Sequence, residues 1–207
     1  GLILNMIHYF WPSLLKMNFV VSMVTPIIKA TKGSDTKSFY TDSAFRTWYG
    51  SGKSGWRIKY YKGLGTSTSA EAREYFKKIQ DLTVKFDADT MTDDSIILAF
   101  DKKKADARKT WLLESTAKEA NQLEIPYGDV KQLNITDFVH KDLVNFSLAD
   151  LKRSIAHVAD GLKPSQRKVM YSCFQKNLKD EMKVAQLAAY VAEKSAYHHG
   201  EVSLAET

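Results

Sequence analysis

The segment of residues 56–80 constrains the fold most, because it joins three kinds of local structure in a fixed order. Residues 56–61 alternate between apolar and polar side chains, which predicts a β-strand. Two glycines follow within Lys62–Ser67, and Thr68 with Glu71 has the spacing of a capping box at a helix start. A strand, a glycine-rich loop and a helix N-terminus in succession predict an α/β domain.

The residues before this segment are compatible with the same kind of domain. Apolar residues recur at helical spacing over Leu2–Lys16, and β-branched residues fill Phe19–Ile28, a strand that we expect to break at Pro26. Lys37–Thr41 is a further strand candidate. Since nothing before Gly1 caps the first helix, we expect this domain to begin upstream of the chain.

Beyond residue 85 the pattern changes to helices. The expected helices cover residues 93–100, 102–114, 136–150, 165–176, 183–194 and 200–207, with Thr136 as a cap and Pro164 in a first turn. The last two are separated by a short turn, as in a helix-turn-helix. We therefore predict an α/β plus mainly α fold, with a linker at Ile125–Gly128. The predicted parts are residues 1–85, 86–130 and 131–207.

The net charge of +6 is unevenly distributed along the chain. Residues 1–85 carry 13 Lys and Arg against 5 Asp and Glu, residues 86–149 carry 8 against 12, and residues 150–207 carry 9 against 7. Two basic stretches around an acidic middle predict two surfaces that can meet a polyanion. A soluble basic protein without such a partner is the alternative, and charge alone leaves it open.

Two groups of cations lie beside expected helix starts. In the first, the amides and glycines of Lys62–Ser67 combine with nearby Lys59, an arrangement that favours an anion. In the second, Lys163 and Arg167 flank a helix start, with Lys152–Arg153 nearby, and could hold a phosphate. The alternatives are a simple connecting turn in the first case and a solvated charged face in the second.

Motifs for nucleotides and metals are weak. Gly52–Ser54 is not a Walker A loop, because Thr47 stands where its first glycine belongs. Asp87 and Asp89 have no third carboxylate at a useful spacing. The neighbouring His198–His199 pair lacks the i, i+4 spacing of zinc ligands, so donation to a phosphate is the better interpretation. We expect no metal or cofactor to be held by residues of this chain.

Several of these motifs, taken in order, resemble the eukaryotic-type DNA topoisomerase II family (type IIA), whose viral relatives share them. The resemblance rests on residues 59–67 (KYYKGLGTS), 99–106 (AFDKKKAD), 160–168 (DGLKPSQRK), 183–188 (KVAQLA) and 197–201 (YHHGE). It implies the C-terminal part of a TOPRIM α/β domain, a helical connector, and the start of a winged-helix domain of the DNA breakage–reunion core.

The resemblance also implies an activity for the full-length parent. Such an enzyme uses ATP and Mg²⁺, cleaves, passes and religates double-stranded DNA through a tyrosyl-phosphodiester, and acts as a homodimer in the nucleus, or in the host cytoplasm if viral. The family's metal carboxylates are expected before Gly1 and its nucleophilic tyrosine after Thr207, so we expect this chain to bind DNA without cleaving it. No membrane contact is expected, because the apolar run Ile7–Leu15 is short and interrupted.

The resemblance assigns roles to individual residues. Arg153 and His199 match residues that support catalysis at the scissile phosphate. The residues that match duplex contacts are Tyr61, Lys62, Arg153, Lys163, Arg167, Tyr197, His199 and Ser203. The alternative function is a non-enzymatic helix-turn-helix DNA-binding module, which would read base edges and show a strong sequence preference.

Overall fold

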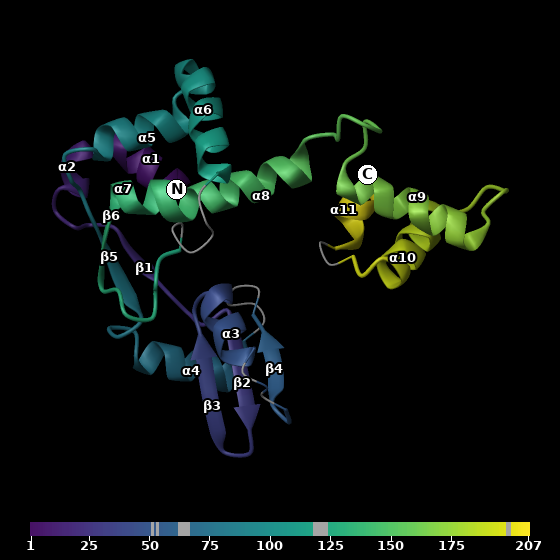
Figure 1. Ribbon diagram of the computed structural model, residues 1–207, viewed down its shortest axis with the longest axis horizontal. Helices are drawn as coiled ribbons and strands as arrows, with labels where there is room; N and C mark the ends of the chain where they lie inside the picture. Colours follow the sequence, from purple (N-terminus) through teal and green to yellow (C-terminus); the bar gives the residue numbers. More distant parts are fainter. Residues whose placement is uncertain (51, 53, 62–66, 118–123, 198–199) are drawn as a thin grey trace. The chain divides into compact units, whose positions relative to one another are not determined.

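The computed structural model describes residues 1–50, 52, 54–61, 67–117, 124–197 and 200–207 (Figure 1). These residues form two compact units, Gly1–Asn145 and Phe146–Thr207. Within the described ranges, no helix is both long and apolar enough to cross a bilayer.

A three-stranded antiparallel sheet forms one part of the first unit. Its order is β3 (Asp35–Phe39), β2 (Ile28–Lys32) and β4 (Arg57–Tyr60). β2 is central, so it is paired on both sides, and its Ala30 is fully buried. Gly33 links β2 to β3 with φ of 60°, a left-handed conformation that glycine adopts without a steric penalty.

A second three-stranded sheet combines strands that are distant in the sequence. Its order is β1 (Val21–Met23), β5 (Thr83–Asp87) and β6 (Gln132–Asn134). β1 and β5 are antiparallel, with Met23 opposite Thr83, whereas β5 and β6 are parallel. The parallel pair is joined through helices, as parallel strands require a crossover connection. The other sheet lies within residues 24–82, which leave β1 and return to β5.

Helices complete the first unit. They are α1 (Leu2–Phe10), α2 (Pro12–Leu15), α3 (Asp42–Tyr49), α4 (Ser69–Lys77), α5 (Thr92–Phe100), the 3₁₀-helix η2 (Lys102–Lys104), α6 (Ala105–Thr116), α7 (Ile135–Asp137) and the π-helix η4 (Phe138–Leu143). α1 packs against α5, where His8 Nε2 lies 2.9 Å from Asp93 Oδ1. Ile96 of α5 and Val139 of η4 are buried, so the core of this layer lies between these helices.

The second unit is helical. α8 (Val144–Ser154) begins at the end of the first unit and continues into the second, which also contains α9 (Pro164–Lys176), α10 (Val184–Lys194) and α11 (Glu201–Ala205). α10 packs against both α9 and α11. Ala188, Val191 and Leu204 form the buried core of this arrangement. α10 and α11 therefore form the helix-turn-helix that the sequence predicts.

The structure confirms several elements expected from local patterns. β4 lies within residues 56–61, and α4 begins directly after Thr68, which forms the predicted capping box with Glu71. α9 begins at Pro164 as expected, because proline fits the first helical turn, where its missing N–H leaves no hydrogen bond unmade.

Other expectations were wrong. The helix expected over Leu2–Lys16 is interrupted at Trp11, because the residue before a proline disfavours helical backbone. The break expected at Pro26 is present, but the two parts of Phe19–Ile28 belong to different sheets, since β1 ends at Met23 and β2 begins at Ile28. Thr136 is not a cap, since its hydroxyl lies inside the helical segment and donates to Asp89 Oδ1 at 2.6 Å. In addition, α3, β5 and β6 have no counterpart in the sequence-based prediction.

Candidate nucleic-acid interface

A basic pocket of about 570 Å³ lies in the second unit. It is lined by Ala149, Lys152, Arg153, Pro164, Ser165, Lys168, Tyr197 and Ser203. These residues come from α8, the start of α9, and the segment from the end of α10 into α11 (Figure 1). The fold thus brings together cations and hydroxyl groups that are up to about 50 positions apart in the sequence, and Arg153, Tyr197 and Ser203 belong to the predicted site.

Arg153 is held at the wall of this pocket by its own helix. Its Nη2 donates a hydrogen bond to Asp150 Oδ1, one turn earlier in α8, and Ser154 Oγ donates to the same oxygen at 3.2 Å. The hydrogen bond from Arg153 holds the pKa of Asp150 below its ordinary value. A guanidinium carries five N–H donors, so a group held in this way can still donate to a phosphate oxygen.

Tyr197, Ser203 and Lys168 form a second wall. Tyr197 donates its hydroxyl hydrogen to Ser203 Oγ at 3.2 Å. The ammonium nitrogen of Lys168 lies 5.7 Å from the centre of the Tyr197 ring, a distance at which a cation is attracted to an aromatic face. This wall carries one positive charge and two hydroxyl groups, and such groups commonly contact the phosphates of a nucleic-acid backbone.

Arg167, another predicted site residue, lies next to a carboxylate. It forms a bidentate pair with Asp160, with Nε to Oδ2 at 2.7 Å and Nη2 to Oδ1 at 2.9 Å. These hydrogen bonds, with one from the Leu162 amide, hold the pKa of Asp160 well below its ordinary value. Arg167 does not line the basic pocket, and its pairing stabilises the loop that leads into α9.

That loop is closed by backbone hydrogen bonds. The His157 amide donates to the Leu162 carbonyl at 3.0 Å, and the Gly161 amide donates to the His157 carbonyl at 2.8 Å. Gly161 has φ of 68°, which explains a glycine at this turn. At its end, the Lys163 amide donates to Gln166 Oε1 at 2.9 Å and so begins α9. The Lys163 side chain is exposed and lies outside the lining of the pocket.

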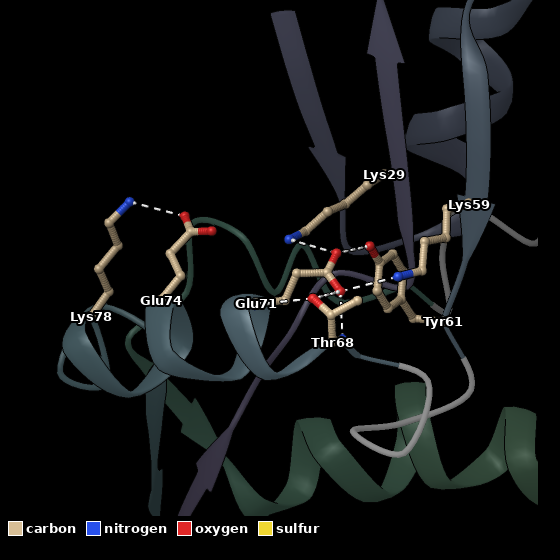
Figure 2. Close-up of polar contacts among 7 residues, drawn as sticks. All are labelled: Lys29, Lys59, Tyr61, Thr68, Glu71, Glu74 and Lys78. Atoms are coloured by element: carbon tan, nitrogen blue, oxygen red, sulfur yellow. Dashed lines mark hydrogen bonds and ion pairs between the residues drawn. The ribbon is translucent and has the colours of Figure 1, made fainter. Parts of the chain in front are cut away.

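In the first unit, the carboxylate of Glu71 accepts hydrogen bonds from several polar groups close in sequence to the glycine-rich segment (Figure 2). Glu71 Oε2 accepts hydrogen bonds from the Thr68 amide at 2.8 Å and from Lys59 Nζ at 3.0 Å, and Glu71 Oε1 accepts one from the Tyr61 hydroxyl. Lys29 Nζ lies 3.7 Å from Glu71 Oε1. Burial alone would raise the pKa of Glu71, but these hydrogen bonds outweigh it and lower the pKa to about 2.

Tyr61 faces inward rather than toward solvent. It is 8% exposed, and burial together with its hydrogen bond to Glu71 raises its pKa to about 12. Lys59 Nζ lies 4.6 Å from the centre of its ring. A buried phenol with an engaged hydroxyl is placed to position its neighbours. Lys62 and His199, two further predicted site residues, lie outside the described residues.

Asp87 and Asp89 have structural partners. Asp87 Oδ1 accepts a hydrogen bond from Asn18, and Asp89 Oδ1 accepts one from the Met91 amide at 2.9 Å at the start of α5. Across the ranges that the structure describes, no group of three or more His, Cys, Asp or Glu side chains could hold a metal ion.

Sequence reasoning missed some participants in both places. Lys29 is a buried lysine between the buried residues Ile28 and Ala30 of β2, an unusual position that indicates a buried partner. Glu71 was identified as a helix cap, but its contacts with Lys29, Lys59 and Tyr61 depend on the packing of β2 and β4 beside α4. Lys152 was noted as a charge, and only the fold places it in one pocket with Arg153 and Lys168.

The two parts of the chain match two protein families. Residues 23–151, more than half of the chain, match the C-terminal associated domain of TOPRIM. Residues 153–207 match the A-type subunit of DNA gyrase/topoisomerase IV. The architecture is therefore that of a TOPRIM-associated domain followed by the beginning of a type II topoisomerase A-type region.

Comparison with individual proteins gives the particular family. The chain is 51% identical over 209 residues to a probable DNA topoisomerase 2 of Dictyostelium discoideum and 46% identical over 217 residues to human DNA topoisomerase 2-alpha. Both alignments cover the whole of this chain but only 14% of the relative's length. It also matches, with a TM-score of 0.81 and 47% identity, a crystal structure of the Plasmodium falciparum topoisomerase II DNA-binding, cleavage and re-ligation domain, covering 28% of that chain. The chain belongs to the eukaryotic DNA topoisomerase 2 family and corresponds to a part of its breakage–reunion core, which confirms the resemblance and the fold class predicted from the sequence.

Proposed function

We propose that this chain supplies a DNA-backbone binding surface within an ATP-dependent type IIA DNA topoisomerase. The observation that carries the proposal is the basic pocket, where Lys152, Arg153 and Lys168 meet the hydroxyl groups of Tyr197 and Ser203. Cations and hydroxyl groups that share one pocket are suited to successive phosphates of one strand. The names of the relatives, which include a DNA-binding, cleavage and re-ligation domain, support the same function.

The contacts of the described residues, and the family resemblance for Lys62 and His199, support individual roles. Arg153, oriented by Asp150, donates to the phosphate nearest the pocket and in the full enzyme supports cleavage there, together with His199. Tyr197 and Ser203 contact neighbouring backbone oxygens. Lys163 and Lys62 add charge along the same duplex. Arg167 acts indirectly, since its guanidinium is paired with Asp160.

The full-length enzyme in this proposal uses Mg²⁺ and ATP, works as a homodimer and acts in the nucleus. The described residues of this chain do not fit a Mg²⁺ site, because Asp87 and Asp89 are engaged in structural hydrogen bonds. Their contribution is to bind and orient DNA, and no step assigned to them involves the metal or the nucleotide.

The competing proposal is a non-enzymatic helix-turn-helix module. It is not favoured by the full-length alignment of this chain with type II topoisomerases. The two proposals differ in the DNA sequence preference that they predict. A backbone-binding surface gives similar affinities for unrelated duplexes and a steep salt dependence, whereas a base-reading module discriminates between sequences.

Fluorescence anisotropy titrations of two unrelated duplexes, at several salt concentrations, test the proposal. We expect Arg153→Ala to weaken binding about tenfold for both duplexes, equivalent to about 1.4 kcal/mol, near the lower limit for a hydrogen bond to a charged group. The slope of log affinity against log salt should decrease by about one.

Lys109→Ala is the matched control for this experiment. Lys109 is an exposed cation that, like Arg153, pairs with an aspartate three residues earlier: Lys109 Nζ lies 2.9 Å from Asp106 Oδ1. Both variants remove one positive charge from a similar ion pair. Equal losses of affinity in the two variants would mean that net charge, and not the pocket, binds DNA. Topoisomerase activity itself is measured as ATP-dependent relaxation of supercoiled plasmid by the full-length enzyme.

A further inference from the structure

The two residues that flank the glycine-rich segment both contact one side chain (Figure 2). Tyr61, at the end of β4, donates its hydroxyl hydrogen to one oxygen of Glu71. Thr68, at the start of α4, donates its amide hydrogen to the other oxygen at 2.8 Å. A single carboxylate therefore joins Tyr61 to Thr68.

The capping role of Glu71 accounts for only part of this arrangement. A capping box needs the Thr68 amide and the Glu71 carboxylate, together with the Thr68 hydroxyl, which here accepts from the Glu71 amide at 3.3 Å. The hydrogen bonds from Tyr61 and Lys59 and the ion pair with Lys29 are additional to it. These additional donors come from β2, β4 and the residue after β4.

The cluster around Glu71 is enclosed, which makes its contacts strong. The Glu71 side chain is 20% exposed and that of Lys29 is 11% exposed. Lys29 Nζ also lies 4.7 Å from the centre of the Tyr75 ring and 5.6 Å from that of Tyr61. Because charged hydrogen bonds are stronger away from solvent, loss of the carboxylate would leave buried donors without their acceptor.

We propose that Glu71 is a positioning residue for duplex binding, because its carboxylate joins Lys59 and Tyr61 to Thr68 at the start of α4 and so holds this basic part of the first unit in the arrangement that meets the DNA backbone. The inference rests on the proposed function. It assigns a role in DNA binding to an acidic residue. It therefore predicts that removing this negative charge weakens duplex binding, whereas simple electrostatics predicts that binding becomes stronger. Removing a negative charge ordinarily strengthens binding to a polyanion.

Glu71→Gln and Glu74→Gln form a matched pair of variants. Glu74 lies one turn further along α4, where it is exposed and pairs with Lys78 at 3.3 Å (Figure 2). Both substitutions remove one negative charge from the same helix. We expect Glu71→Gln to weaken duplex binding by roughly three- to tenfold, which is less than the full loss of a charged hydrogen bond because Glu71 acts through its neighbours. Glu74→Gln should leave binding unchanged or strengthen it slightly.

The measurement is anisotropy with a labelled duplex, made at a temperature where circular dichroism shows each variant fully folded. A merely structural role for Glu71 would lower the melting temperature without changing the affinity of the folded protein. The inference is overturned if folded Glu71→Gln binds as tightly as Glu74→Gln, or more tightly. Absence of binding by the unsubstituted chain would instead overturn the proposed function, so the two failures are distinguishable.

Tyr61→Phe decides the question if Glu71→Gln does not fold. This substitution removes one hydroxyl donor to Glu71 and keeps every charge and the helix cap. In that case, weaker duplex binding by Tyr61→Phe supports the positioning role, and an affinity equal to that of the unsubstituted chain overturns it.

Discussion

At the scale of single residues, Glu71 and Tyr61 show how surroundings change a side chain's role. Tyr61 lies next to the glycine-rich segment, and its sequence position predicted a surface contact. Its ring is buried because β4 delivers it beneath α4, where Glu71 accepts its hydroxyl hydrogen. Sequence spacing identifies Thr68 and Glu71 as a pair, since they are three residues apart. The contact with Lys29, more than 40 positions away, depends on the strand order of the sheet.

The lowered pKa of Glu71 predicts a defined dependence of stability on pH. The ordinary pKa of 4.5 falls to about 2 in the folded chain. The unfolded chain therefore binds a proton before the folded chain does, so this stabilisation is complete above pH 4.5 and is lost as the pH falls toward 2. Urea unfolding should show that Glu71→Gln is more destabilising at pH 7 than at pH 3. An equal difference at both pH values would contradict the assignment.

At the scale of elements, strong local signals were sufficient for some helices and strands but not for others. α4 and α9 carry their own start signals, a capping box and a first-turn proline. β6 has three residues, too few for a periodic pattern to be recognised. β5 does alternate, with Val84 and Phe86 buried, but it leads into an acidic stretch whose following residues are helical.

α3 was missed although its start is marked. Thr41 accepts a hydrogen bond from the Ala44 amide at 3.2 Å, as an N-cap residue does. Phe45 and Trp48 of this helix pack against Phe39 of β3, with ring centres 5.4 and 5.1 Å away. In the sequence, these aromatic residues are equally compatible with a strand, and contact with the sheet determines the helix.

The cap of α4 gives a prediction for this scale. Thr68→Ala removes the hydroxyl that accepts the Glu71 amide hydrogen, and should lower the free energy of unfolding by about 1 kcal/mol. Thr110→Ala, at an exposed position inside α6, is the control and should be neutral or slightly stabilising, because alanine favours helix interiors. Both are measured by urea unfolding. A loss no larger than that of the control would show that the capping box contributes little.

At the scale of the whole molecule, the chain is divided into two compact units, and each contributes one of the clusters described above. From local charge and glycine patterns, the sequence indicated both regions as candidate anion-binding groups. It could not predict which cations share a pocket, because Arg153 and Lys168 are brought together only by the return of the chain between α8 and α9. The family resemblance predicted the order of the domains along the chain, whereas the positions of the pocket residues depend on the packing of the helices.

The separate cores predict independent responses to substitution. Val191→Ala removes two methyl groups from a fully buried position in the core of the second unit, and should cost about 2 kcal/mol there. Hydrogen exchange should accelerate for amides of α10 and α11. Amides of β2, in the first unit, should exchange as before. Equal acceleration in both units would show that they unfold as one.

The pairing of β1 with β5 has a consequence for how this protein can be rearranged. Residues 24–82 leave and return through adjacent strand ends, where the Val24 amide donates to the Leu82 carbonyl at 2.8 Å. Residues 24–82 are thus an insertion between two paired strands. A short reverse turn from Met23 to Thr83 could replace them and keep β1 paired with β5. Circular permutation at this junction would open the backbone only there, whereas removing residues 24–82 would also break the hydrogen bonds from Ser43 to Glu124 and from Lys131 to the Asp81 carbonyl.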